Sequence, residues 1–268
     1  MYFKLTIEFK EKNQKDFAIA DLISLPITGV FEEETKLTAY FKSKPDSAAL
    51  DALSEKYTVT FGTEESSAHD WLLKFKNSFS RLELSDKLNI VPLWNKDKGD
   101  SNSIYIMPGL AFGTGLHFTT KSSLELMETL NFENKKVLDF GCGTGILSIY
   151  AERLGAGSIL AVDNDIEAVK EAKKHCRYNE CKKVKAAFGD IFDIPGKFDI
   201  ILANILFEVL AERLPYLSDK LNRNGYLLFA GVITPYKENF IKALEDNNLK
   251  IIKIVEDREW VSGLSILE

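Results

Sequence analysis

A glycine-rich turn follows the apolar segment Val137–Phe140, with Gly141, Gly143 and Gly145 at alternate positions. Residues without a Cβ atom let the chain turn sharply and let backbone N–H groups approach a ligand. The pattern therefore predicts a ligand-binding loop between a strand and a helix. Asp163 ends the next predicted strand, 22 residues after Gly141. Its carboxylate can accept hydrogen bonds from two ribose hydroxyls.

The spacing of this loop indicates which ligand it binds. A nicotinamide dinucleotide site has the pattern G-x-G-x-x-G and places a pyrophosphate at the helix N-terminus. Ile146 stands where the third glycine would be, which makes a dehydrogenase the least favoured interpretation. Asp139 precedes the loop, and a carboxylate suits the ammonium group of an amino acid better than a pyrophosphate. The pattern resembles the loop of class I methyltransferases, which implies S-adenosyl-L-methionine as the cofactor.

A second glycine-rich segment, Met107–Lys121, precedes this loop. Its three glycines lie among aromatic and hydroxyl side chains, which favours a lid over a small ligand rather than a simple connector. We expect Phe112 to contact the cofactor from this lid, and Thr119 and Thr120 to stand just before a helix. His117 is expected to form hydrogen bonds or to pack, with a role as general base as the alternative.

Strands and helices alternate after the lid. The predicted strands are Val137–Phe140, Ser158–Asp163, Val184–Phe188, Phe198–Ala203 and Tyr226–Ala230. This order predicts a doubly wound, Rossmann-like α/β sheet, which binds ligands at the carboxyl ends of its strands. The residues expected to gather there are Gly141, Asp163, Asp190 and Asn204. The tail, Leu249–Leu267, predicts an antiparallel strand pair joined near Asp257.

The front of the chain predicts a smaller α+β domain. Apolar residues alternate from Phe3 to Phe9, the period of a half-buried strand. The elements expected after it are a helix over Lys15–Ser24, a hairpin of Ile27–Glu33 and Lys36–Phe41, a helix after Pro45-Asp46, and a strand over Tyr57–Phe61. The order β-α-β-β-α-β is that of a ferredoxin-like module. We interpret this module as a recognition domain because it carries no catalytic constellation.

These elements predict three parts. Residues 1–65 form the ferredoxin-like recognition domain, residues 66–102 form a linker, and residues 103–268 form the methyltransferase domain. Within the linker we expect a helix over Ser66–Ser80 and a short β segment over Leu88–Trp94.

The composition limits the partners. The 268 residues carry a net charge of −6, whereas enzymes that act on nucleic acid usually present a basic face. Residues 1–68 hold eight Lys and no Arg against twelve acidic residues, which favours a Lys-rich protein partner. Three cysteines, Cys142, Cys176 and Cys181, predict neither a disulfide set nor a metal site. Without a signal peptide or a long apolar run, we expect a cytoplasmic monomer and no membrane contact.

Three motifs carry a more specific resemblance. The segments Pro108–Gly115, Asp139–Leu147 and Ala203–Leu206, in this order, resemble those of the bacterial ribosomal protein L11 methyltransferases. The likeness extends to the front domain, to Asp70-Trp71 and to Glu259-Trp260. It implies a front domain that binds ribosomal protein L11. It also implies a rear domain that methylates lysine ε-amines and the N-terminal α-amine of that protein.

The resemblance also implies roles for individual residues. The cofactor positions of the family fall on Thr120, Gly141, Asp163 and Asn204. Gly141 and its neighbours would approach the methionyl part, Asp163 would hold the ribose, and Asp190 would meet the adenine amine. Thr120 would close from the lid, and Asn204 would orient the amine beside the sulfonium. Leu116-His117-Phe118 departs from the usual Thr-His-Pro of the family, which puts the shape of the lid in doubt.

The residues after Asn204 bear on the substrate. Enzymes of this class that methylate planar amides or base amines commonly carry Asn-Pro-Pro-aromatic, whereas this chain has Asn-Ile-Leu-Phe at 204–207. A tetrahedral amine, methylated by in-line displacement without a covalent enzyme intermediate or a metal, fits better. The alternatives are a methyltransferase for lysine of another protein, an RNA methyltransferase, and a non-catalytic S-adenosylmethionine-binding regulator.

Overall fold

The computed structural model describes residues 2–9, 18, 22, 25, 27–32, 35–41, 43–57, 59–66, 81–98, 100–107, 117–257 and 259–268. The chain divides into two compact units, Met1–Ser80 and Arg81–Glu268. This division falls inside the segment 66–102 that the sequence predicts as a linker. The helix predicted over 66–80 begins one residue too early, because Ser66 ends a strand, and its residues 67–80 lie outside the described residues. Of the helix predicted over 15–24, only Ala18 and Leu22 are described.

The first unit contains a four-stranded antiparallel sheet. Its elements are β1 (Tyr2–Phe9), β2 (Ile27–Glu32), β3 (Lys36–Phe41), α2 (Ser47–Lys56) and β4 (Val59–Ser66). The strand order β2-β3-β1-β4 is that of the predicted ferredoxin-like module. Leu5 and Ile7 alternate into its core, where Leu53 of α2 packs against the sheet. Asp46 begins α2 by accepting a hydrogen bond from the N–H of Ala48.

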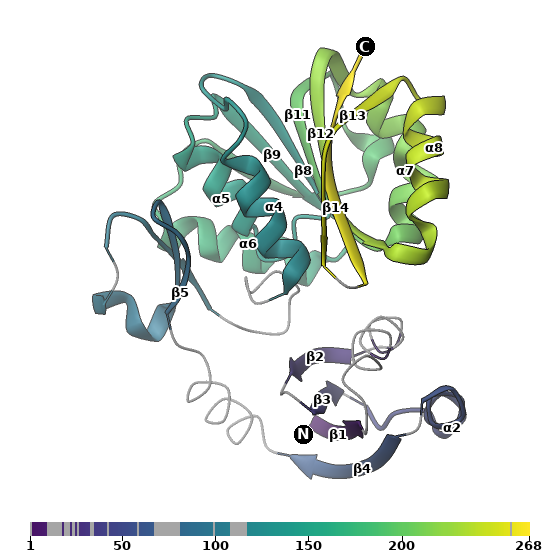
Figure 1. Ribbon diagram of the computed structural model, residues 1–268. Coiled ribbons are helices and arrows are strands. Elements are labelled where there is room, and N and C mark those ends of the chain that lie inside the picture. Colours follow the sequence, from purple (N-terminus) through teal and green to yellow (C-terminus); the bar gives the residue numbers. More distant parts are fainter. Residues whose placement is uncertain are drawn as a thin grey trace. The chain divides into compact units, whose positions relative to one another are not determined.

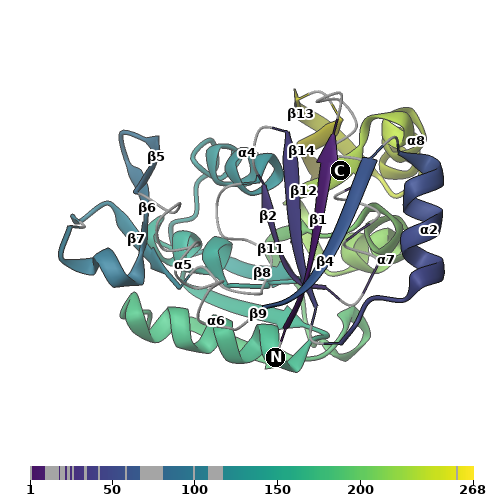
Figure 2. The same ribbon diagram turned by 90° about the horizontal axis from the view of Figure 1, so that it is seen from below.

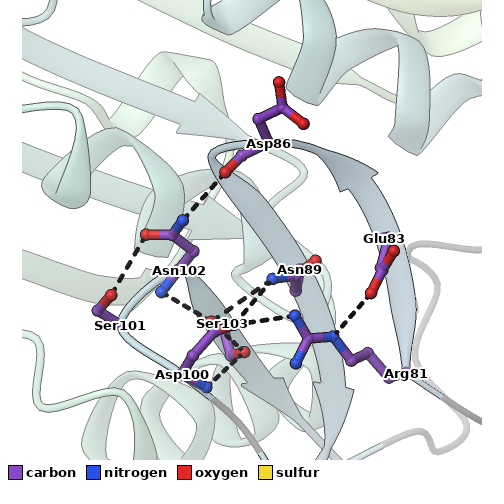
Figure 3. A network of polar contacts seen from close by, with 8 residues as sticks. All are labelled: Arg81, Glu83, Asp86, Asn89, Asp100, Ser101, Asn102 and Ser103. Carbon is purple, nitrogen blue, oxygen red and sulfur yellow. Dashed lines mark hydrogen bonds and ion pairs between the residues drawn. The ribbon is translucent and has the colours of Figure 1, made fainter.

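The second unit begins with a small sheet that the sequence predicts only in part. Its elements are β5 (Leu82–Ser85), β6 (Leu88–Pro92), the 3-10 segment η2 (Leu93–Lys98) and β7 (Ser103–Ile106). A polar network around Asp100 holds these short strands together (Figure 3). Asp100 accepts hydrogen bonds from the Ser103 hydroxyl at 2.9 Å and from Asn102 N–H at 3.0 Å, and it pairs with Arg81 at 2.9 Å.

The large sheet of the second unit has seven strands in the order β10-β9-β8-β11-β12-β14-β13. They are β8 (Lys136–Phe140), β9 (Ser158–Asp163), β10 (Val184–Phe188), β11 (Phe198–Asn204), β12 (Leu221–Ile233), β13 (Leu249–Asp257) and β14 (Trp260–Leu267). The first five are parallel, and β14 runs antiparallel to both of its neighbours. The predicted doubly wound sheet and its antiparallel tail are therefore confirmed.

Helices cover both faces of this sheet (Figures 1 and 2). They are α4 (Phe118–Met127), α5 (Ile146–Arg153) and α6 (Ile166–Tyr178), then α7 (Phe207–Asp219) and α8 (Lys237–Asp246), with 3-10 turns η3 (Ile191–Asp193) and η4 (Thr234–Tyr236). The first three helices share one hydrophobic core with the sheet, and α7 and α8 share a second. Among the described residues, no helix is both long enough and apolar enough to cross a membrane.

Candidate functional site

Two adjacent strands at the centre of the large sheet mark the site. The chain leaves β8 into α5 on one face, and it leaves the neighbouring strand β11 into α7 on the other face. The carboxyl ends of two such strands form a topological switch point, where doubly wound sheets bind ligands. Gly141 directly follows β8 and Asn204 ends β11, so the structure places both at this point.

The glycine loop is held in shape by the protein itself. The loop glycines have φ angles of +73° at Gly141, +50° at Gly143 and +78° at Gly145. The N–H groups of Gly141 and Cys142 both donate to the carbonyl of Val162, at 2.8 and 3.0 Å. That of Gly143 donates to the Asp163 carboxylate at 2.9 Å. β9 therefore supplies acceptors for all three N–H groups and fixes the path of the loop. That the loop binds a ligand stays a prediction.

Asp163 joins the glycine loop to the turn after β9. One oxygen of its carboxylate accepts from Gly143 N–H, and the other accepts from Asp165 N–H at 2.9 Å. Each carboxylate oxygen can accept a further hydrogen bond. The carboxylate is thus fixed in orientation while it keeps acceptor sites for hydroxyl groups.

Asp139 is a buried carboxylate with one partner. It is 1% exposed, and one oxygen, Oδ2, accepts from both the N–H and the hydroxyl of Ser148, at 3.0 and 2.6 Å. The other oxygen, Oδ1, is buried without a hydrogen-bond partner among the described residues. Burial raises the pKa of Asp139 to about 7, against the lowering effect of Ser148. An ammonium group beside Oδ1 would supply the missing donor and favour the charged form.

Ile205, directly after Asn204, packs against two glycines. A Cβ atom built on Gly141 would lie 2.2 Å from the Ile205 side-chain atom Cγ2, and one on Gly231 would lie 2.1 Å from the Ile205 carbonyl oxygen. Both glycines also have positive φ, +73° and +92°. The end of β11 therefore fits closely against the glycine loop on one side and β12 on the other. No local sequence pattern connects the three positions, so the sequence does not predict this contact.

Thr120 and Asn204 are brought together. Asn204 Nδ2 donates to Thr120 Oγ1 at 3.5 Å. Thr120 is fully buried and lies in the first turn of α4. The prediction that Thr119 and Thr120 precede the helix is therefore wrong. Their position follows from the cap. His117 is the N-cap residue just before α4, and its Nδ1 accepts a hydrogen bond from Thr119 N–H.

His117 also lies edge-on against Trp260, with ring centroids 5.0 Å apart. Capping and ring packing agree with the hydrogen-bonding role expected for it.

Asp190 is engaged by a cation that the sequence did not indicate. Its carboxylate accepts from Arg213 Nε at 3.2 Å and from Arg213 Nη2 at 3.1 Å, and it caps the η3 turn through Ile191 N–H. Asp190 raises the pKa of Arg213. Arg213 lies 23 residues later on α7, so no local spacing could have indicated this pair. Phe112 lies outside the described residues.

The geometry of the fold defines a class of enzyme, and a family-model match then assigns the family. The seven-stranded sheet with β14 antiparallel, the glycine loop after β8 and the acid that ends β9 define a class I methyltransferase dependent on S-adenosylmethionine. The family model described as "Ribosomal protein L11 methyltransferase (PrmA)" matches residues 4–265. The chain therefore belongs to the ribosomal protein L11 methyltransferase family.

Individual relatives agree with this assignment. A ribosomal protein L11 methyltransferase from Lactobacillus johnsonii is 32% identical over 95% of this chain and 88% of its own length. One from Acetivibrio thermocellus is 33% identical over 95% of this chain and 86% of its own length. The crystal structure of a ribosomal protein L11 methylase from Lactobacillus delbrueckii subsp. bulgaricus has a TM-score of 0.64 at 33% identity. It covers 70% of this chain and 98% of that one.

Proposed function

We propose that this protein acts in the cytoplasm and transfers methyl groups from S-adenosyl-L-methionine to ribosomal protein L11, at lysine ε-amines and the N-terminal α-amine. The observation that carries the proposal is the family match over residues 4–265, which includes parts of both compact units. The net charge of −6 supports a basic protein substrate rather than a nucleic acid.

The cofactor, when bound, supplies an electrophilic methyl group on a positively charged sulfur. The residues proposed to hold it lie at the strand ends and in the lid: Thr120, Asp139, Gly141, Gly143, Asp163, Asp190, Asn204 and Phe112. Asp139 would accept from the ammonium group through Oδ1, and Asp163 would accept from the ribose hydroxyls. Asp190 would meet the adenine amine with an oxygen that Arg213 already orients. The Oδ1 atom of Asp139 is buried and has no hydrogen-bond partner in the described part of the chain, which supports the role of Asp139.

Asn204 is the residue proposed to orient the substrate amine. A lysine with an ordinary pKa near 10.4 pays roughly 4.6 kcal/mol to be neutral at pH 7. A positive charge nearby and partial loss of water both reduce this cost by favouring the neutral amine. Asn204 Nδ2 donates to Thr120, and this bond orients the amide. In that orientation its oxygen Oδ1 would accept a hydrogen bond from an amine N–H.

Intact-mass spectrometry tests the proposal directly. Unmethylated ribosomal protein L11 is incubated with this protein and S-adenosylmethionine, beside a Lys-rich control protein and an RNA sample. We expect steps of about 14 Da, the CH₂ increment of each amine methylation, on the ribosomal protein alone. Absence of any step, with cofactor binding intact by calorimetry, would assign another substrate or a regulatory role. Transfer to the RNA would contradict the protein substrate.

A further inference from the structure

His175 lies in the buried face of α6 and contacts two segments far apart in the sequence. Its side chain is 1% exposed. Nδ1 lies 2.9 Å from the carbonyl oxygen of Thr144 in the glycine loop, and the N–H of Met107, just after β7, donates to Nε2 at 3.0 Å. Buried residues of α6 recur at helical spacing, and His175 is the strongly polar one among them.

These two contacts define the protonation state of the ring. A carbonyl only accepts, so Nδ1 carries the proton, and Nε2 must be unprotonated to accept from Met107. The imidazole is therefore the neutral Nδ1–H tautomer. Burial lowers the pKa of His175, which agrees with a neutral ring, although Glu171 Oε2 lies 3.7 Å from Nε2.

Both contacts join His175 to segments next to the proposed cofactor site. Thr144 is in the turn between Gly143 and Gly145, so the bond from His175 fixes the carbonyl of that turn from the side of α6. Met107 is the last described residue before the glycine-rich segment 108–116. The same ring thus connects the glycine loop to the strand that leads into the predicted lid.

We propose that His175 is a positioning residue for the cofactor, which acts through the Thr144 carbonyl and the Met107 N–H and touches neither the cofactor nor the substrate. This inference rests on the proposed function, because it assigns the glycine loop, together with Met107 after β7, to one cofactor site. Loss of the ring would leave both segments in place but less well ordered. The cost would then appear in cofactor affinity, with the rate of a saturated enzyme nearly unchanged.

Asn179, the residue that caps the C-terminus of α6, provides a control that leaves the His175 imidazole contacts intact, although its side chain also donates to the His175 backbone carbonyl at 2.9 Å. Its side chain accepts from Tyr105 N–H at 2.8 Å and donates to Tyr105 carbonyl at 2.7 Å. Like His175, it joins the region of α6 to β7 by side-chain hydrogen bonds. Unlike His175, its side chain is not bonded to the glycine loop in these contacts. A variant at Asn179 reports what loss of α6–β7 hydrogen bonds does to general stability.

The experiment compares the full-length wild type with His175→Phe, His175→Gln and Asn179→Leu. Calorimetry measures the Kd of S-adenosylhomocysteine, and a methylation assay gives kcat at saturating cofactor. We expect His175→Phe to weaken binding about tenfold, the effect of one lost buried hydrogen bond on an equilibrium constant. The glutamine, which can both donate and accept, should recover most of the affinity. Asn179→Leu should lower the melting temperature and change Kd less than twofold.

Several results would overturn the inference. They are an unchanged Kd in His175→Phe, an equal loss in Asn179→Leu, and a glutamine variant no better than the phenylalanine. If the His175 variants do not fold, imidazole ¹⁵N spectra of the wild type decide. A protonated Nδ1 whose signal shifts on addition of S-adenosylhomocysteine supports the role, and a protonated Nε2 or an unmoved signal contradicts it. A wild type that binds no cofactor refutes the proposed function instead.

Discussion

Burial raises the pKa of Asp139 to about 7, far above the ordinary value of 3.8. The folded protein therefore keeps a proton on this carboxyl over the pH range, about 4 to 7, in which the unfolded chain has lost it. The stability that the proton provides is present at low pH and is lost as the pH rises through this range. The Asp139 carboxyl is therefore neutral at low pH. Above about pH 7 it is a buried charge, which lowers the free energy of unfolding.

The first prediction concerns the effect of Asp139→Asn on stability. The amide has the same shape and no charge, so it should remove this pH dependence from the cofactor-free protein. From pH 5 to pH 8, the free energy of unfolding of the variant should rise relative to the wild type by about 2 to 4 kcal/mol. Urea denaturation of both proteins across this range measures the difference. Two curves that stay parallel would show that Asp139 titrates normally.

Cofactor binding should expel the same proton. An ammonium group placed beside Oδ1 favours the carboxylate, which lowers the pKa of Asp139. At pH 6 we expect S-adenosylmethionine binding to release up to one proton, seen as a binding enthalpy that depends on the ionisation enthalpy of the buffer. Asp139→Asn should bind with an enthalpy that is the same in every buffer. Equal proton release from the variant would assign the ammonium to another partner.

Asn204 allows a test that separates turnover from binding. If its Oδ1 orients the substrate amine, Asn204→Ala should lower kcat by about 10- to 100-fold and change the cofactor Kd much less. Asn222→Ala is a suitable control, because Asn222 lies at the start of β12 and bonds to Asp199. Normal turnover in Asn204→Ala would remove Asn204 from the catalytic role.

At the scale of elements, the strands of the large sheet were predictable and several caps and contacts were not. The predicted bounds of β9 and β10 agree with the structure, and those of β8 differ by one residue. Each of these three strands is predictable because it is an apolar run that ends in an acidic residue or is followed by glycine. The start of α4 was misplaced because histidine is an uncommon helix cap. The ion pair between Asp190 and Arg213 joins residues that are distant in the sequence. So do the contacts of Ile205 with Gly141 and Gly231, and only the folded structure reveals either set.

The small β5-β6-β7 sheet shows the same limit. Two of its strands have four residues each, too short for a clear alternation, and the predicted segment Leu88–Trp94 corresponds to β6 with the start of η2. Its stability depends on contacts such as that between Arg81 and Asp100 (Figure 3), which lie 19 residues apart. Side-chain hydrogen bonds of this range have no periodic signal in a sequence.

Ser103 is fully buried within that network, and its hydroxyl allows a test of the sheet. Its hydroxyl donates to Asp100 Oδ1 and accepts from Asp100 N–H at 3.0 Å. Ser103→Ala leaves that N–H without its acceptor, so it should destabilise the protein by about 1 to 2 kcal/mol. Hydrogen exchange should become faster in β5–β7 in particular. Ser101→Ala, at an exposed residue, should change neither, and an equal effect there would contradict a role for burial.

At the scale of the molecule, the two units have separate cores. Every described residue of the candidate cofactor site belongs to the second unit. The recognition role of the first unit stays a prediction, and its acidic balance suits a basic partner. We therefore expect the first unit to choose the substrate and the second unit to carry the cofactor.

This division leads to a prediction for a shortened chain. Residues 81–268 should bind S-adenosylhomocysteine within about threefold of the full-length Kd, because the cofactor residues and their core are retained. Their kcat/KM for ribosomal protein L11 should fall by at least about 100-fold, since loss of recognition contacts reduces substrate affinity. Calorimetry and mass spectrometry measure the two quantities. Undiminished methylation by the short chain would show that the first unit has no part in recognition.

The contacts of Ile205 bear on how this chain can change over evolution. Gly141 is crowded by a side-chain atom, so a smaller residue at 205 would relieve the crowding and leave only the cost of a positive φ. Gly231 is crowded by a backbone oxygen, which no substitution at 205 removes. A replacement at 141 should therefore be less harmful together with a smaller residue at 205 than alone, whereas 231 should accept none. Ile205 thus restricts Gly141 through a side chain that evolution can change, and it restricts Gly231 through a backbone oxygen that every residue carries.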